Sequence, residues 1–200
     1  MEHQNTLGGK NRNPLNIRYN PKNNWRGQIS QNAGLCVFSH EAYGFRAAYK
    51  LITSYIGNGY NTIEKIITRW APPSENDTEA YIKAVLKLSG LGGNENIPRP
   101  NRFRNFERLE KTICLIRAMT CVECGIPWKE VDVPAIWRGY DLAYPGRREM
   151  YCYPSKRTSY SAVDETEEQD EEEHEPTDEE LEDARKPPVW DEYWDWSTSL

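Results

Sequence analysis

Hydrophobic residues recur every three or four positions through several long segments of the chain, and this spacing predicts a mainly α-helical fold. The first predicted helix covers residues 39–55, with Ser39 as its N-cap and Gly57 beyond its end. One face of this helix carries Phe45, Ala48, Leu51, Ile52 and Tyr55. We expect further helices over residues 62–70, 78–88, 106–124 and about 134–144.

The segment before these helices has a different pattern. Residues 14–38 are rich in Asn, Gly and Pro and contain two short apolar runs, at residues 17–19 and 35–38. This pattern predicts a small N-terminal β-hairpin formed by the two runs. We expect residues 1–12 to be a flexible start and residues 13–150 to form a single globular domain, which is long enough for one hydrophobic core.

The C-terminal part has a composition of its own. Residues 156–200 hold 17 of the 31 acidic residues and 4 of the 25 basic ones, so residues 1–155 keep 14 acidic and 21 basic. A body of charge about +7 therefore carries a tail of charge about −13. Residues 164–183 are too charged to bury a core, and we expect residues 151–200 to be a disordered acidic tail.

The end of this tail interleaves aromatic and acidic residues. The letters PPVWDEYWDW at residues 187–196 contain no long carboxylate run. Two interpretations stay open: the aromatic residues are anchors in a partner's groove, or they pack loosely on their own domain.

Composition also bears on the compartment. No apolar run approaches the length of a membrane span, and the N-terminus lacks the pattern of a signal peptide. The chain has five cysteines, an odd number that does not indicate a disulfide framework. We therefore expect the protein to be made in a cytoplasm.

A rigid elbow links two of the predicted helices. The letters RWAPPSENDTEAY at residues 69–81 contain two consecutive prolines, which end the preceding helix and force the chain to turn. Asn76 or Asp77 can then cap the next helix by accepting hydrogen bonds from its first free N–H groups.

Several motifs resemble one family of small virion structural proteins found in phages and prophages. The matching letters are NPLNIR at 13–18, NWRGQ at 24–28, VFS and EAYGFRA within 37–47, YNTI at 60–63, and ITRWAPP at 67–73. The family has Gly where this chain has Leu15, so the turn there must form without that glycine's positive φ. The resemblance implies a virion component that is made in the host cytoplasm and binds other virion proteins.

Cysteine and histidine chemistry has little support in the sequence. Cys36 and His40 are the one conceivable nucleophilic pair, and no third orienting group accompanies them. Cys121 and Cys124 have the spacing of a metal knuckle but lack a second ligand pair, so two buried thiols are the expected interpretation. We expect no metal and no cofactor.

Glu123 is the candidate for acid catalysis. The helix over 106–124 ends in the letters VECG, which resemble the Glu-Ser-Gly helix ending of lysozyme-like lytic transglycosylases and glucosaminidases. In those enzymes the glutamate is the general acid, and apolar surroundings keep it protonated. Other pieces of the glucosaminidase pattern precede the helix here, so the resemblance implies a permuted lysozyme-like fold. An ordinary buried helix-end glutamate is the alternative.

The number of acids needed depends on the mechanism. Retaining and inverting glycosidases use two carboxylates, and the candidates for the second are Glu41, Glu75 and Asp77. Cleavage assisted by the substrate's own acetamido group needs one carboxylate. The aromatic candidates for a sugar-binding groove are Trp25, Tyr43, Trp70 and Tyr81, although aromatic residues at such positions commonly belong to a core.

Three functions remain open at this point. The first is a virion-associated peptidoglycan hydrolase that helps the genome through the cell wall. The second is a non-catalytic virion structural or adaptor protein. The third is a nucleic-acid binder, suggested by the basic body and by Arg99, Arg102, Arg104 and Arg108, and it ranks last because no base-reading element accompanies the charge.

Overall fold

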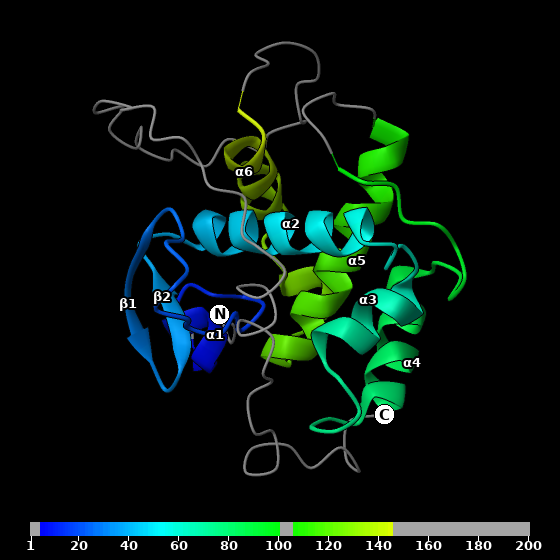
Figure 1. Ribbon diagram of the computed structural model, residues 1–200, viewed down its shortest axis with the longest axis horizontal. Helices are drawn as coiled ribbons and strands as arrows, with labels where there is room; N and C mark the ends of the chain where they lie inside the picture. Colours follow the sequence, from blue (N-terminus) through cyan, green and yellow to red (C-terminus); the bar gives the residue numbers. More distant parts are fainter. Residues whose placement is uncertain (1–4, 101–105, 146–200) are drawn as a thin grey trace.

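A computed structural model of the chain describes residues 5–100 and 106–145 (Figure 1). It is mainly helical with a small N-terminal hairpin, as the hydrophobic pattern predicts. The elements are α1 (Leu7–Lys10), β1 (Gln28–Asn32), β2 (Leu35–Phe38), α2 (Glu41–Gly57), α3 (Ile63–Trp70), α4 (Thr78–Ser89), α5 (Phe106–Cys124), the 3₁₀ turn η2 (Trp128–Glu130) and α6 (Val133–Ala143). The acidic tail predicted for residues 151–200 lies outside the described residues.

The hairpin pairs different segments from those predicted. β2 occupies the expected residues, but its antiparallel partner is β1, with Asn32 opposite Leu35. Ala33 and Gly34 form the two-residue turn, and both have positive φ, as a tight hairpin with the usual strand twist requires. The run expected as the first strand instead lies on the other edge of β2, where Arg18 and Leu35 form an isolated bridge.

The residues that precede the hairpin in the sequence are also part of the fold. Residues 7–10 form the short helix α1, which differs from the flexible start expected for residues 1–12. Gly8 is buried against the end of α5, and a Cβ at this glycine would lie 2.8 Å from the Cys124 Sγ. Asn11 is also buried, so residues just before the predicted domain boundary belong to the fold.

The helices begin where side-chain caps are available. His40, rather than the predicted Ser39, caps α2, because its Nδ1 accepts a hydrogen bond from the Ala42 N–H. Thr62 caps α3, and α5 covers the predicted residues. Asp132 caps α6, whose first turn contains Pro134.

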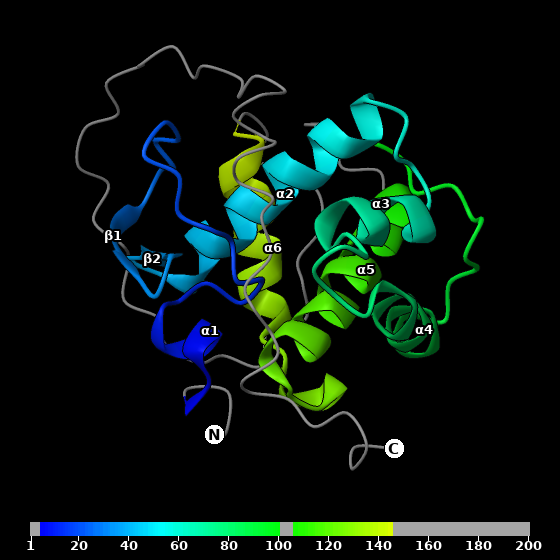
Figure 2. The same ribbon diagram turned by 60° about the horizontal axis from the view of Figure 1, so that its bottom comes forward.

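Helices α2 and α6 run through the middle of the molecule. The hairpin and α1 lie on one side of this pair, and α3, α4 and α5 lie on the other (Figure 2). Gly139 permits the close approach of α6 to α2, because a Cβ there would lie 2.5 Å from the Phe45 Cβ. Helix α1 packs on α5, so the N-terminal segment lies close to the C-terminal end of α5.

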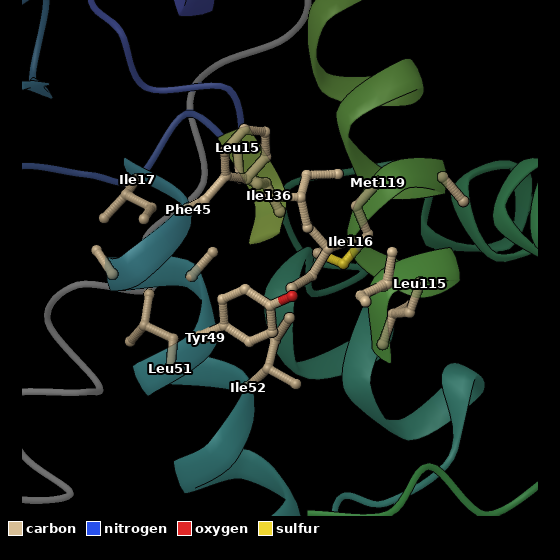
Figure 3. Packing of buried hydrophobic residues seen from close by; sticks show 14 of the residues in the cluster. Leu15, Ile17, Phe45, Tyr49, Leu51, Ile52, Leu115, Ile116, Met119 and Ile136 are labelled. Atoms are coloured by element: carbon tan, nitrogen blue, oxygen red, sulfur yellow. The ribbon is translucent and has the colours of Figure 1, made fainter. Parts of the chain in front are cut away.

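One hydrophobic cluster joins both sides. Its fully buried members include Leu15 from the N-terminal segment, Phe45 from α2 and Ile116 from α5 (Figure 3). Tyr49 lies among them with no exposed surface, and its hydroxyl oxygen points toward the side chains of α5 (Figure 3). Among the described residues this hydroxyl has no hydrogen-bond partner, which is a cost to the folded state.

Removing the Tyr49 hydroxyl should therefore not harm the fold. We expect Tyr49→Phe to leave the free energy of unfolding unchanged or to raise it by about 1 kcal/mol, because the ring stays and an unpartnered polar group is lost. Tyr81→Phe is the matched control, since that hydroxyl is hydrogen-bonded and its loss should lower the free energy. Urea denaturation measures both; a loss of 1 kcal/mol or more in Tyr49→Phe would show that its hydroxyl is paired.

Candidate functional site

The site is centred on Glu123, in the last turn of α5. Its side chain is 5% exposed, so an ionisable group lies in the interior of the protein. Buried carboxylates are uncommon unless they are paired or hydrogen-bonded.

Three donors from three separate segments meet at this carboxylate. The Trp70 indole Nε1–H and the Tyr81 hydroxyl both donate to Oε1, at 2.9 and 2.8 Å. The Asn16 Nδ2 donates to Oε2 at 3.1 Å and to the backbone oxygen of Glu123 at 3.1 Å. The carboxylate therefore joins the N-terminal segment, the end of α3 and the start of α4 to the end of α5.

The segment that supplies Asn16 is held by another asparagine. The buried Asn13 accepts a hydrogen bond from the Ile17 N–H and donates to the carbonyls of Ile17 and Cys36. The positive φ of this turn falls on Asn16, at 48°, and not on Leu15. Asparagine tolerates this left-handed conformation better than most residues, so Asn16 both closes the turn and reaches Glu123.

The proline elbow supplies Trp70. Its indole is half-buried and packs edge-on against Tyr55, with ring centroids 6.3 Å apart. Below the elbow, the Thr78 hydroxyl donates to the Ala71 carbonyl at 2.5 Å and ties the start of α4 back to the end of α3. This link fixes the spacing between Trp70 and Tyr81, the two donors to one oxygen.

Burial raises the pKa of Glu123 to about 7, because the interior disfavours the charged carboxylate. The hydrogen bonds from Tyr81, Trp70 and Asn16 act in the opposite direction, because they stabilise the anion. The position at the C-terminal end of a helix also disfavours negative charge. The group can therefore hold or release a proton near neutral pH, which is what a general acid requires.

The three candidates for a second carboxylate lie in different environments. Asp77 caps α4, since its Oδ1 accepts from the Ala80 N–H at 2.9 Å. Glu75 is exposed on the elbow, and its charge raises the pKa of Arg18, although burial lowers that pKa more strongly. Glu41 is partly buried in the first turn of α2, and its charge is one of the influences that raise the pKa of the Cys124 thiol.

The four aromatic candidates separate into two groups. Trp70 and Tyr81 contact Glu123 directly, but Tyr81 is buried and faces the carboxylate as a hydrogen-bond donor. Trp25 belongs to the hydrophobic core, and Tyr43 packs beneath Gly27, where a Cβ would lie 2.2 Å from its ring. Sequence reasoning missed Asn16, whose one signal was its place in the NPLNIR motif.

The thiols of the described residues are not arranged as a reactive site. Burial raises the pKa of Cys36 to about 12 and that of Cys121 to about 11, so both remain protonated. Within residues 5–100 and 106–145, no three His, Cys, Asp or Glu side chains are grouped as metal ligands. In the same part of the chain, no helix has both the length and the apolar character needed to cross a membrane.

Comparison with known proteins identifies a phage relative. The chain is similar to Protein P5 of Pseudoalteromonas phage PM2, with 35% identity over 95 residues. The matched region covers 45% of this chain and 59% of the phage protein, a little more than half of its length. No protein family model matches the chain. The similarity supports the phage origin implied by the motifs.

The cap of α4 can be tested separately from the site. We expect Asp77→Ala to lower the free energy of unfolding by about 1 kcal/mol, because the Ala80 N–H loses its acceptor. Asp77→Ser should restore most of the loss, because serine also accepts this bond. Chemical denaturation at constant pH measures both variants, and equal stability of the alanine and serine variants would contradict the cap.

The buried acid also predicts a pH dependence of stability. Because the pKa of Glu123 is about 7 in the folded state and 4.5 without burial, the folded protein binds more protons between these values. The free energy of unfolding should therefore fall, relative to Glu123→Gln, by on the order of 3 kcal/mol as pH rises from about 4.5 to 7. Denaturation of both proteins from pH 4 to 8 measures this. A difference that stays constant across this range would contradict the burial of an ionisable Glu123.

Proposed function

We propose that this chain is a virion-associated phage protein and that Glu123 is the general acid of a cell-wall glycosidase site. The phage part rests on the similarity to Protein P5 of phage PM2 and on the motifs that resemble virion structural proteins. The virion location and the partnership with other virion proteins follow from the family that the motifs resemble.

The arrangement around Glu123 carries the catalytic part of the proposal. A glycosidase acid must be protonated when substrate binds and must keep a fixed orientation. Burial gives Glu123 a pKa of about 7, and three hydrogen bonds hold its side chain. Two of the three donors, Asn16 and Trp70, come from the motifs NPLNIR and ITRWAPP, which also supplied the sequence resemblance, and Tyr81 lies in the helix that follows.

The chemistry requires a single carboxylate if the substrate assists. Peptidoglycan contains N-acetylated sugars, and the acetamido oxygen of such a sugar can attack its own anomeric carbon. In this step Glu123 transfers its proton to the glycosidic oxygen as the bond between that oxygen and the anomeric carbon breaks. The resulting carboxylate then accepts a proton from the water that opens the cyclic intermediate, and the acid form is restored.

A substrate sugar needs access to Glu123, and this requires a conformational change from the structure described. Glu123 is 5% exposed, so a sugar can reach it after a covering side chain moves. Trp70 is the member of the donor set that is half-buried, and it lies next to the two-proline elbow. Its indole is therefore the part of the donor set nearest to solvent.

A second function is favoured by the same burial. Glu123 accepts from three donors and links four segments, which is also the role of a structural residue in a virion component without catalysis. This alternative predicts the same fold and the same phage relationship. It differs in predicting no wall-degrading activity.

Glu123→Gln separates the two functions. The variant keeps the shape of the side chain but cannot donate the proton, so wall-degrading activity should fall by at least about 100-fold. Glu110→Gln, an exposed position on the same helix, is the matched control and should keep full activity. A zymogram on bacterial cell walls, supported by circular dichroism of each variant, makes the measurement.

Two results would contradict the glycosidase proposal. Equal activity in Glu123→Gln and the wild type would exclude Glu123 as the acid. Activity in neither protein, with both folded, would leave the structural role.

A further inference from the structure

The hydrogen bonds to Glu123 occupy three of the four positions where its carboxylate can accept a bond. Each carboxylate oxygen has about two lone-pair positions. Oε1 accepts from both Trp70 and Tyr81, so both of its positions are filled. Oε2 accepts from Asn16, and one position on Oε2 remains.

We infer that the dissociable proton of Glu123 resides on Oε2, and that Asn16, Trp70 and Tyr81 are positioning residues that keep it there. This inference rests on the proposed function for its catalytic meaning and on the hydrogen-bond geometry for its physical basis. It identifies which oxygen faces the scissile bond. The glycosidic oxygen must approach Oε2, the oxygen on the side of the Asn13–Arg18 turn.

Two of the three neighbours can act only as donors toward Glu123, and the third, Tyr81, is placed as a donor. The indole nitrogen of Trp70 has a hydrogen and no lone pair to offer. Burial and the adjacent Glu123 raise the pKa of Tyr81 well above its usual value, so its hydroxyl stays protonated and has a hydrogen to donate to Oε1. The Asn16 amide also contacts the backbone oxygen of Glu123, which can only accept, so its NH₂ group must face the glutamate.

The donors also fix the side chain mechanically. Asn16 binds the backbone oxygen and the carboxylate of the same residue, which holds the Glu123 side chain against the end of its own helix. Tyr81 is buried and donates to Oε1 from α4, whereas Asn16 holds Oε2 from the N-terminal segment, so each oxygen is held by a different segment. The adjacent Cys124 thiol also interacts with Glu123, and burial raises the pKa of this thiol to about 12, so it stays neutral.

Tyr81→Phe is the sharpest test, because it removes one hydroxyl and leaves the ring. Losing this donor opens a second position for the proton, on Oε1, and removes the shortest of the three hydrogen bonds to the carboxylate. The proton affinity of Glu123 should therefore rise about tenfold, the scale expected for one hydrogen bond to a charged group. NMR of protein labelled with ¹³C at the glutamate carboxyl measures the titration, with Glu123→Gln to assign the signal.

Tyr55→Phe is the matched control. Tyr55 is also buried and packs on Trp70, but it lies outside the donor set of Glu123. This variant should leave the titration of Glu123 unchanged. An unchanged titration in Tyr81→Phe, or an equal shift in both tyrosine variants, would overturn the inference.

Activity measurements keep this inference separate from the proposed function. If the protein cleaves cell walls, Tyr81→Phe should lower kcat with little change in KM and should move the alkaline limb of the pH profile upward. If the wild type has no activity, the glycosidase proposal fails while the NMR titration still decides whether Tyr81 positions the proton. A shifted titration with unchanged kcat would contradict the assignment of Oε2 as the donating oxygen.

Discussion

The burial of one carboxylate organises this protein. Glu123 lies inside the domain, where a charge is unfavourable, and the fold compensates with hydrogen bonds from Asn16, Trp70 and Tyr81. These residues are far apart in the sequence: 107 positions separate Asn16 from Glu123. Their convergence determines how the N-terminal turn and the proline elbow sit against the end of α5.

Much of the helical structure could be predicted from the sequence because its determinants are local. Apolar spacing predicted α2 and α5, and the aspartate that caps α4 was one of two candidates in the sequence. Strand β1 escaped detection because most of its side chains are exposed and polar, so no alternation of apolar residues indicates it. Helix α1 escaped because two of its four residues are glycines, which are poor helix formers.

The site was predictable in its parts and not in its assembly. Glu123 stood out because it ends an apolar helix, and Trp70 and Tyr81 stood out as aromatic residues near the elbow. Their hydrogen bonds to one oxygen depend on how α3, α4 and α5 pack, which no local pattern specifies. Asn16 was missed because an asparagine in a turn ordinarily serves its own backbone, as the neighbouring Asn13 does.

A buried acid that titrates near neutral pH serves either of two roles. In a glycosidase it is the proton donor, and in a structural protein it is a polar link whose charge weakens the fold as the pH rises. Both roles start from the same property of Glu123, a pKa raised to about 7 by burial, so this property can be tested without deciding the function.

Infrared spectroscopy of the wild-type protein measures this property directly, because a protonated carboxyl has a carbonyl band separate from that of a carboxylate. The band that disappears in Glu123→Gln should be present at pH 6 and should be lost with a midpoint near pH 7. Loss of that band near pH 4.5 would contradict the account, because it would show that the carboxyl of Glu123 is not held in a buried environment.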